Sequence, residues 1–298
     1  MIDSAALRIH ERLALLPELR PVRLGEGRRF ALWDLASTAE GALGEILEPD
    51  SLTVSLERRL RLRLGAYGRD RRIDDNHGRR YWITDGHGTV GTIAVGLWPT
   101  GGDALQVWSL YVHPVARHRG MATAVLDAVY AACVAEGLGG YRLDAYWTWR
   151  DSVRFYLGRG LWLTSWKRAL ALARLSFLPE YEVREAPGGD LEFWVAGDGP
   201  LLVAGRSQDG KWLRLTESEA YARVTAAQPR AVMPVYAHAT LALHLAVRGR
   251  PLVREEEAEW VHRWSGDTGG PEGLAYRIGR FEQAARHDGW LVPGDGGD

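Results

Sequence analysis

Residues 105–138 read LQVWSLYVHPVARHRGMATAVLDAVYAACVAEGL, and this stretch decides the fold of the chain. An apolar run from Leu105 to Val112 ends at His113-Pro114, and a short basic turn follows. From Met121 to about Ala135, apolar residues recur at helical spacing. The stretch therefore predicts a strand, a tight turn and a long helix.

The turn, Arg117-His118-Arg119-Gly120, favours a bound phosphate. The first backbone N–H groups of a helix have no intrahelical partner, and the helix dipole adds positive charge at the same end. Gly120 lets a ligand approach the backbone closely, and the two arginines supply forked donors. An ordinary strand-to-helix connection with solvated arginines would explain the same residues, so the turn alone leaves both interpretations open.

This stretch resembles the GNAT superfamily of acyl-CoA-dependent N-acyltransferases. The family signature is Arg or Gln, two residues, Gly, one residue, then Gly or Ala, and it matches Arg117–Ala122. Asp151-Ser152-Val153-Arg154-Phe155-Tyr156, followed by Gly160-Leu161, is similar to the family's late motif. The resemblance covers about residues 20–168 and leaves the C-terminal part unexplained.

The resemblance implies acetyl-CoA, or another acyl-CoA, as co-substrate. In the family, the turn holds the pyrophosphate, and the fourth strand splays from the next one and binds the pantetheine arm and the acyl carbonyl through its backbone. The corresponding positions here are Leu110, Tyr111, Val112, Arg117, His118, Arg119, Gly120, Met121, Ala122 and Thr123.

For catalysis, the resemblance puts Tyr156 where the family has a tyrosine that protonates the departing thiolate. A tyrosine that only packs between the helix and the sheet would give the same sequence pattern. For the base we favour Asp144 or a water relay, with Asp103 and His113 as further candidates. Many family members have an asparagine facing the cofactor at the position where this chain has Trp149.

The predicted function is therefore transfer of an acetyl or short acyl group from CoA to a primary amine of a small-molecule or peptide acceptor. The alternative is a non-catalytic acyl-CoA-binding module whose C-terminal domain contacts a protein partner. Both predict CoA binding, so only acceptor-dependent release of free thiol distinguishes them.

Composition narrows the class of protein. The chain has 298 residues with a net charge of −1, which gives no general attraction to nucleic acid or an anionic membrane. Residues 1–16 lack the basic start and apolar centre of a signal peptide, and no run approaches the ~20 apolar residues of a membrane span. We expect a cytoplasmic protein with neither nucleic-acid nor membrane partners.

Other chemistries find little support in the sequence. Cys133 is the only cysteine, which excludes an intrachain disulfide, and its place on an apolar helix predicts a core residue. No His, Cys and Asp grouping has the spacing of a metal site, so we expect no metal. Dinucleotide, Walker and serine-hydrolase motifs are also missing from the sequence.

The order of elements predicts an α/β (α+β) fold with a mixed, mostly antiparallel sheet flanked by helices. Helices are expected over 4–16 with Ser4 as cap, 27–47 interrupted at Gly41 and Gly44, 51–64, 121–135 and 150–158. Strands are expected over 19–24, 81–84, 89–97, 105–112, 141–147 and 161–166, with a hairpin at 85–88. Strands 105–112 and 141–147 flank a helix and should be parallel.

We place a domain boundary between residues 1–174 and 175–298, with helical spacing after Trp166 as the connection. Four short apolar runs with Gly-rich turns predict a meander, and helices should follow. The runs are 181–186, 191–196, 200–206 and 211–216, and the helices are 217–227, 240–247, 254–264 and 274–287. His238 and His244 should be packed or capped. We expect a folded accessory α+β domain that shapes acceptor choice or dimerisation, which leaves a homodimer open.

Overall fold

The computed structural model of the protein describes residues 2–43, 78–97, 103–145, 149–166, 170–195, 199–206, 213–221, 238–239, 242–243 and 291–292. The chain forms two compact units, one of residues 1–144 with 174–176 and one of residues 145–173 with 177–298. The predicted boundary after residue 174 stays a prediction. The helices predicted over 51–64, 254–264 and 274–287 lie outside the described residues.

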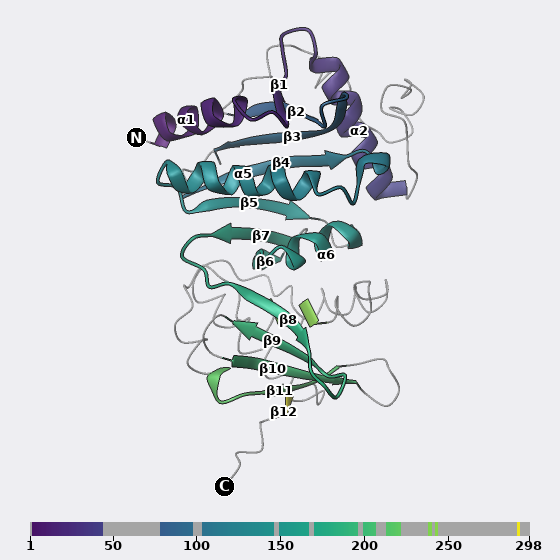
Figure 1. Ribbon diagram of the computed structural model, residues 1–298, viewed down its shortest axis with the longest axis vertical. Coiled ribbons are helices and arrows are strands. Elements are labelled where there is room, and N and C mark those ends of the chain that lie inside the picture. The colour runs from purple at the N-terminus through teal and green to yellow at the C-terminus, as the bar shows by residue number, and fades with distance from the viewer. Residues whose placement is uncertain are drawn as a thin grey trace. The chain divides into compact units, whose positions relative to one another are not determined.

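The first unit is built on strands that follow one another in space as in sequence (Figure 1). They are β1 (Leu19–Pro21), β2 (Arg79–Thr84), β3 (Thr89–Leu97), β4 (Ala104–Val112) and β5 (Gly140–Ala145). Within this unit the strand order is β1-β2-β3-β4-β5. Neighbours from β1 to β4 are antiparallel, and β4 and β5 are parallel. The predicted mixed, mostly antiparallel sheet is confirmed.

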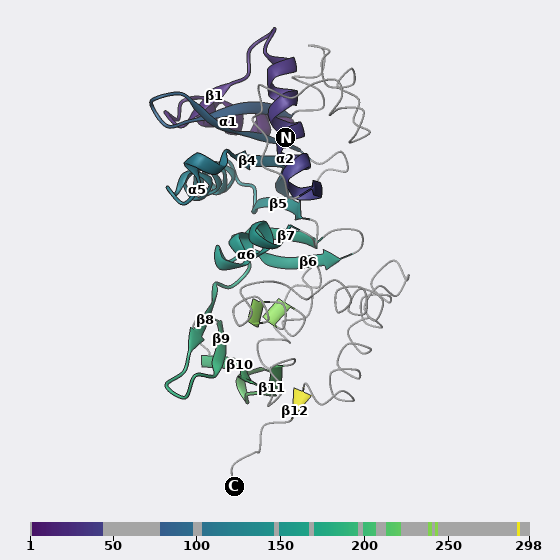
Figure 2. The same ribbon diagram turned by 90° about the vertical axis from the view of Figure 1, so that its right-hand side faces the viewer.

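Helices cover both faces of this part of the sheet (Figure 2). Helices α1 (Ile2–Ala14) and α5 (Met121–Ala135) lie on one face, and α2 (Gly27–Leu43) lies on the other. Two corrections follow. Helix α1 begins at Ile2, so Ser4 lies inside it, and α2 continues through Gly41 because one glycine costs only about 1 kcal/mol in a helix that is packed on a sheet.

The predicted hairpin between β2 and β3 is confirmed. The Asp85 N–H donates to the Gly88 carbonyl over 3.2 Å, and the Asp85 carboxylate accepts from the N–H of His87 at 3.0 Å. Gly86 has a φ of +86°, a backbone conformation that favours glycine. The turn residues therefore fix the register of β2 and β3.

The second unit contains α6 (Arg150–Gly158), β6 (Trp162–Trp166) and all but the end of β7 (Leu170–Leu175), which pairs antiparallel with β6. The helical spacing inferred after Trp166 is wrong, because Leu170–Leu175 is a strand. The run LALARL is short and apolar, and periodicity alone does not distinguish a buried strand from a helix at that length. The pairing of this segment with β6 makes it a strand.

A second sheet has the strand order β12-β11-β10-β9-β8. Its strands are β8 (Tyr181–Glu185), β9 (Leu191–Val195), β10 (Gly199–Arg206), β11 (Leu213–Glu217) and β12 (Leu291–Val292). The predicted meander of β8 to β11 is confirmed, since each strand pairs antiparallel with the next. Strand β12 was not predicted, and it pairs parallel with β11.

The core of the second unit is aromatic and encloses His238. This residue is fully buried, and its ring lies 4.5 Å from those of Trp162 and Tyr181. Its Nδ1 accepts the N–H of Leu163 at 3.0 Å. Burial lowers the pKa of His238 to about 3, so the ring is neutral at ordinary pH. The prediction that His238 is packed is confirmed, while His244 lies outside the described residues.

None of the helices within the described ranges is long and apolar enough to cross a bilayer.

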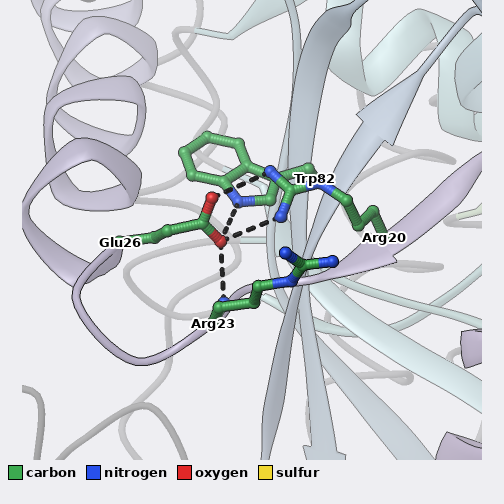
Figure 3. A network of polar contacts seen from close by, with 4 residues as sticks. All are labelled: Arg20, Arg23, Glu26 and Trp82. Atoms are coloured by element: carbon green, nitrogen blue, oxygen red, sulfur yellow. Dashed lines mark hydrogen bonds and ion pairs between the residues drawn. The ribbon is translucent and has the colours of Figure 1, made fainter.

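Helix α2 is anchored to the sheet through Glu26, the residue that precedes it (Figure 3). The Glu26 carboxylate accepts two bonds of 3.0 Å from Arg20, one of 2.7 Å from the N–H of Arg23 and one of 3.1 Å from the indole of Trp82. The hydrogen bonds from Arg20 are the largest cause that lowers the pKa of Glu26 to about 2. Glu26 thus joins β1, β2 and the start of α2.

We predict that Glu26→Gln lowers the free energy of unfolding by about 1–3 kcal/mol at pH 7, because the charge-assisted bonds are lost. The folded-state pKa lies below the ordinary 4.5, so this contribution is present above that pH and is lost as pH falls toward 2. Urea titrations across this range measure it. Glu11→Gln, on an exposed position of α1, is the control and should change little. A constant difference between the Glu26 variant and wild type at every pH would contradict the assignment.

Candidate acyl-CoA site

Strand β4 leaves β5 half-way along its length. The parallel register pairs Ala104–Val107 with Gly140–Leu143 and ends there within the described residues. On its other side β4 stays paired with β3 as far as Val112, with a register shift that makes Trp108 an extra residue. Such a bulge bends a strand and increases its twist. Ser109–Val112 is therefore paired with β3 alone among the described residues, as a splayed fourth strand would be.

Two glycines of β3 make room for this course of β4. A Cβ on Gly96 would lie 2.6 Å from the ring of Trp108, and one on Gly91 would lie 2.2 Å from the carbonyl oxygen of Tyr111. Both distances are below any tolerated contact, so a side chain at either position would push the strands apart. Gly96 thus leaves room for the ring of the bulged Trp108, and Gly91 lets β3 approach the backbone of β4 near its end.

The turn after β4 presents backbone donors. A short 3-10 helix, Pro114–Ala116, leads into Arg117, and His118, Arg119 and Gly120 are exposed. Gly120 has a φ of 79° and precedes α5, and no side chain caps the helix. The first bond of α5 runs from the Ala124 N–H to the Gly120 carbonyl over 2.9 Å. The N–H groups of Met121, Ala122 and Thr123 therefore have no partner inside the helix.

The family signature suggested that the side chain of Arg117 is available to bind phosphate, but in the structure it binds other residues of the protein. Its Nε donates to the Val112 carbonyl at 2.8 Å, and its Nη2 donates to Oε2 of Glu40 at 2.6 Å. Spacing along the sequence cannot reveal this pairing, because Glu40 and Arg117 are 77 residues apart.

The three strand residues expected at the site lie at the end of β4. Tyr111 and Val112 are buried and Leu110 is half-buried. Tyr111 packs in a core cluster, and its ring centre lies 6.0 Å from that of Trp33. Their side chains thus serve packing, and any ligand contact falls to their backbone groups.

Tyr156 lies on α6, in the second unit, and is buried. Its ring meets that of Phe155 edge-on at a centre-to-centre distance of 5.4 Å. Burial raises the pKa of Tyr156 to about 12, so its hydroxyl keeps its proton at neutral pH. A group in this state can donate a proton or a hydrogen bond.

The other sequence candidates for the base fall into different environments. Asp144 lies on β5. Its side chain is exposed in part, and the loss of hydration on the covered part raises the pKa of its carboxyl group. Asp103 is exposed and pairs with Arg142 at 3.0 Å. His113 accepts the N–H of Val115 at Nδ1 over 3.4 Å, which is the role of a turn residue. Trp149 precedes α6 without a side-chain cap.

A carboxylate that the sequence analysis missed lies beside β4. Asp34 comes from α2, and burial raises its pKa against the opposing influence of the Ser109 hydroxyl and the Arg80 charge. The Ser109 Oγ lies close to this carboxyl and has no partner with hydrogen-bond geometry within the described ranges. The available signal was an acid inside the apolar run FALWDLA, residues 30–36.

Neither a metal site nor a reactive cysteine is found among the described residues. No group of three or more His, Cys, Asp and Glu side chains is arranged there to hold a metal ion. Cys133 is buried on α5, and burial raises the pKa of its thiol to about 12. The neutral thiol is a packed core residue, as predicted, because a nucleophile needs the thiolate.

Comparison with known families agrees with this geometry. Residues 44–160 match the model of the Acetyltransferase (GNAT) family. The resemblance inferred from the Arg117–Ala122 signature is thereby confirmed for these residues. The match includes β2 to β5, α5 and α6, and the activity that it indicates in general is acyl transfer.

Solved structures that resemble about half of this chain include two acetyltransferases. The PaiA N-acetyltransferase of Thermoplasma acidophilum, in complex with coenzyme A, is 10% identical with a TM-score of 0.42, over 53% of this chain and 98% of that one. A GCN5-related N-acetyltransferase of Rhodopseudomonas palustris is 19% identical with a TM-score of 0.37, over 53% and 93%. A search of curated proteins found no match. The functional argument therefore rests on the family match and the geometry of residues 104–123.

Proposed function

We propose that the protein transfers an acetyl or short acyl group from acyl-CoA to a primary amine of a small-molecule or peptide acceptor. The observation that carries the proposal is the combination of a strand that parts from its parallel neighbour after Val107 and a turn that ends in an uncapped helix start. The first offers backbone groups to an extended chain, and the second offers N–H donors to an anion. An acyl-CoA donor would need both features next to each other, the first for its pantetheine arm and the second for its pyrophosphate.

The donor would lie along the end of β4 and across the following turn. Backbone groups of Leu110, Tyr111 and Val112 would bind the pantetheine arm and polarise the acyl carbonyl. The N–H groups of Met121, Ala122 and Thr123 would bind pyrophosphate oxygens, and Gly120 would let them approach because nothing lies within 4 Å of its missing Cβ. The exposed Arg119 and His118 flank the same turn.

The reaction needs one base and one acid. The amine nitrogen attacks the thioester carbonyl carbon, so a C–N bond forms and the C–S bond breaks. A base takes the proton of the amine, and the departing thiolate takes a proton from Tyr156. Burial keeps the phenol of Tyr156 protonated, and because it raises the pKa to about 12 it also makes the phenol a weaker acid, so the role rests on the match of Tyr156 to the family's tyrosine position.

The base remains a choice between two carboxylates and a water relay. Asp144 and Asp34 both have raised pKa values, which bring a carboxylate closer to the range of a useful base. Asp34 comes from α2 and lies beside Ser109, the residue of β4 that precedes the segment proposed to bind the acyl group.

Residues 175–298 would shape acceptor choice or dimerisation.

The pyrophosphate site can be tested at Gly120 with a matched control. Gly120 and Gly137 both have left-handed φ values, of 79° and 80°, with open space around them. Glutamate at either position costs about 1–3 kcal/mol of backbone strain. Only Gly120→Glu adds a negative charge where α5 begins, and it should weaken coenzyme A binding about a hundredfold or more, measured by calorimetry. Gly137→Glu should bind as wild type does. Equal affinities in both variants would remove the turn from the site.

Tyr156→Phe should lower the rate of thiol release in the presence of a panel of primary amines by about a hundredfold. Its affinity for acetyl-CoA should stay unchanged, because one hydroxyl is lost and the ring is kept. Tyr130→Phe is the control, since its ring keeps the contact with Arg174 at 4.3 Å. An unchanged rate in Tyr156→Phe would give Tyr156 a packing role only. A wild-type protein that binds acetyl-CoA but releases no thiol above background with any amine would favour the non-catalytic alternative.

The pH profile of kcat/KM identifies the base. A base acts when deprotonated, so a raised pKa moves the acidic limb of the profile to a pH above the ordinary carboxyl value of 3.8. If Asp34 is the base, Asp34→Asn should lower the rate about a hundredfold or more and remove this limb, while Asp144→Asn keeps it. The converse pattern assigns Asp144, and retention in both variants assigns a water relay. Asp190→Asn, at an exposed position between β8 and β9, is the control.

A further inference from the structure

The guanidinium group of Arg117 is engaged on three sides by residues of its own unit. Its Nε donates to the carbonyl oxygen of Val112 at 2.8 Å. Its Nη2 and Nη1 donate to the two carboxylate oxygens of Glu40, the former at 2.6 Å. Its carbon lies 5.7 Å from the centre of the Tyr111 ring. The side chain thus links the last turn of α2, the end of β4 and the turn before α5.

The pair with Glu40 leaves little of the arginine's charge for a ligand. The two side chains are 35% and 21% exposed, and the contact is a two-point fork, the strongest geometry of an arginine and a carboxylate. A pyrophosphate that took Arg117 would leave the Glu40 carboxylate partly buried and unpaired beside another anion. Both effects oppose a direct contact.

The backbone after Arg117 needs such an anchor. His118 has a φ of 61°, and it is the only residue other than glycine with a positive φ among those described. A left-handed conformation costs energy for a residue with a Cβ and persists when its surroundings hold it. The hydrogen bonds of Arg117 fix the chain one residue earlier, and Gly120, itself at 79°, completes the turn two residues later.

We propose that Glu40 and Arg117 form a positioning pair that holds the turn in the shape that binds phosphate, and that Arg117 does not itself contact the phosphate. The inference rests on the proposed function, because it assigns roles within the same coenzyme A site. The pyrophosphate is then bound by the N–H groups at the start of α5 and by the exposed Arg119. Glu40, which carries no part of the family signature, becomes a determinant of affinity.

A double-mutant cycle tests the pair. The dissociation constant of coenzyme A is measured by calorimetry at low and high salt for wild type, Glu40→Gln, Arg117→Gln and the double variant. Each single change should raise it about tenfold, and the double variant should raise it no further, because both break the same contact. The salt dependence should be the same in all four proteins, since no phosphate contact is lost.

Two further variants separate positioning from direct binding. Arg119→Gln should raise the dissociation constant and make it less dependent on salt, and its effect should add to that of Glu40→Gln. His118→Gly in the Arg117→Gln background should restore part of the affinity, because glycine adopts the left-handed conformation without an anchor. If Arg117→Gln does not fold, Arg117→Lys replaces it. Lysine keeps the charge but loses the fork, so the positioning role predicts weaker binding there as well.

The opposite pattern overturns the proposal. It consists of unchanged or tighter binding in Glu40→Gln, with weaker and less salt-dependent binding in Arg117→Gln that His118→Gly does not restore. Arg117 would then be a phosphate ligand, and coenzyme A would still bind to the wild-type protein. A wild-type protein that binds no coenzyme A would overturn the proposed function itself, and with it the role of the pair.

Discussion

The parting of β4 from β5 after Val107 is the constraint on which the rest of the first unit depends. A strand inside a sheet normally pairs on both sides along its length, so a strand that leaves one neighbour half-way needs a structural cause. The extra residue at Trp108 supplies it by bending β4, and Gly91 and Gly96 let β3 follow at close range. The end of β4, which pairs only with β3 among the described residues, then runs directly into the turn that begins α5.

Helix α2 lies on the face of the sheet opposite to α5. Three acidic residues, one just before the helix and two within it, lie in three different environments. Glu26 holds the start of the helix on the sheet through a charged network, and its pKa is lowered. Asp34 is buried beside Ser109, and its pKa is raised. Glu40 pairs with Arg117 near the end of the helix. Position along one helix thus separates an anchor, a candidate base and a positioning group.

The described core of the second unit is held together by the packing of aromatic rings. Trp162, Tyr181 and Phe193 surround the neutral ring of His238, which accepts a backbone N–H of β6. This unit includes the last residues of the GNAT match, which ends at residue 160, and the meander of β8 to β11 that follows. Tyr156 lies in that matched part, and its burial explains its raised pKa.

The sequence by itself determined the features that local chemistry controls. Gly86 and its neighbours specified the hairpin, the spacing from Met121 to Ala135 specified α5, and Gly120 marked the helix start, because each depends on residues close in the chain. Only the tertiary structure decided that LALARL is a strand, that Glu40 takes the side chain of Arg117, and that Asp34 meets Ser109. These contacts join residues far apart in sequence, and pairing partners and burial, which periodicity does not encode, determine them.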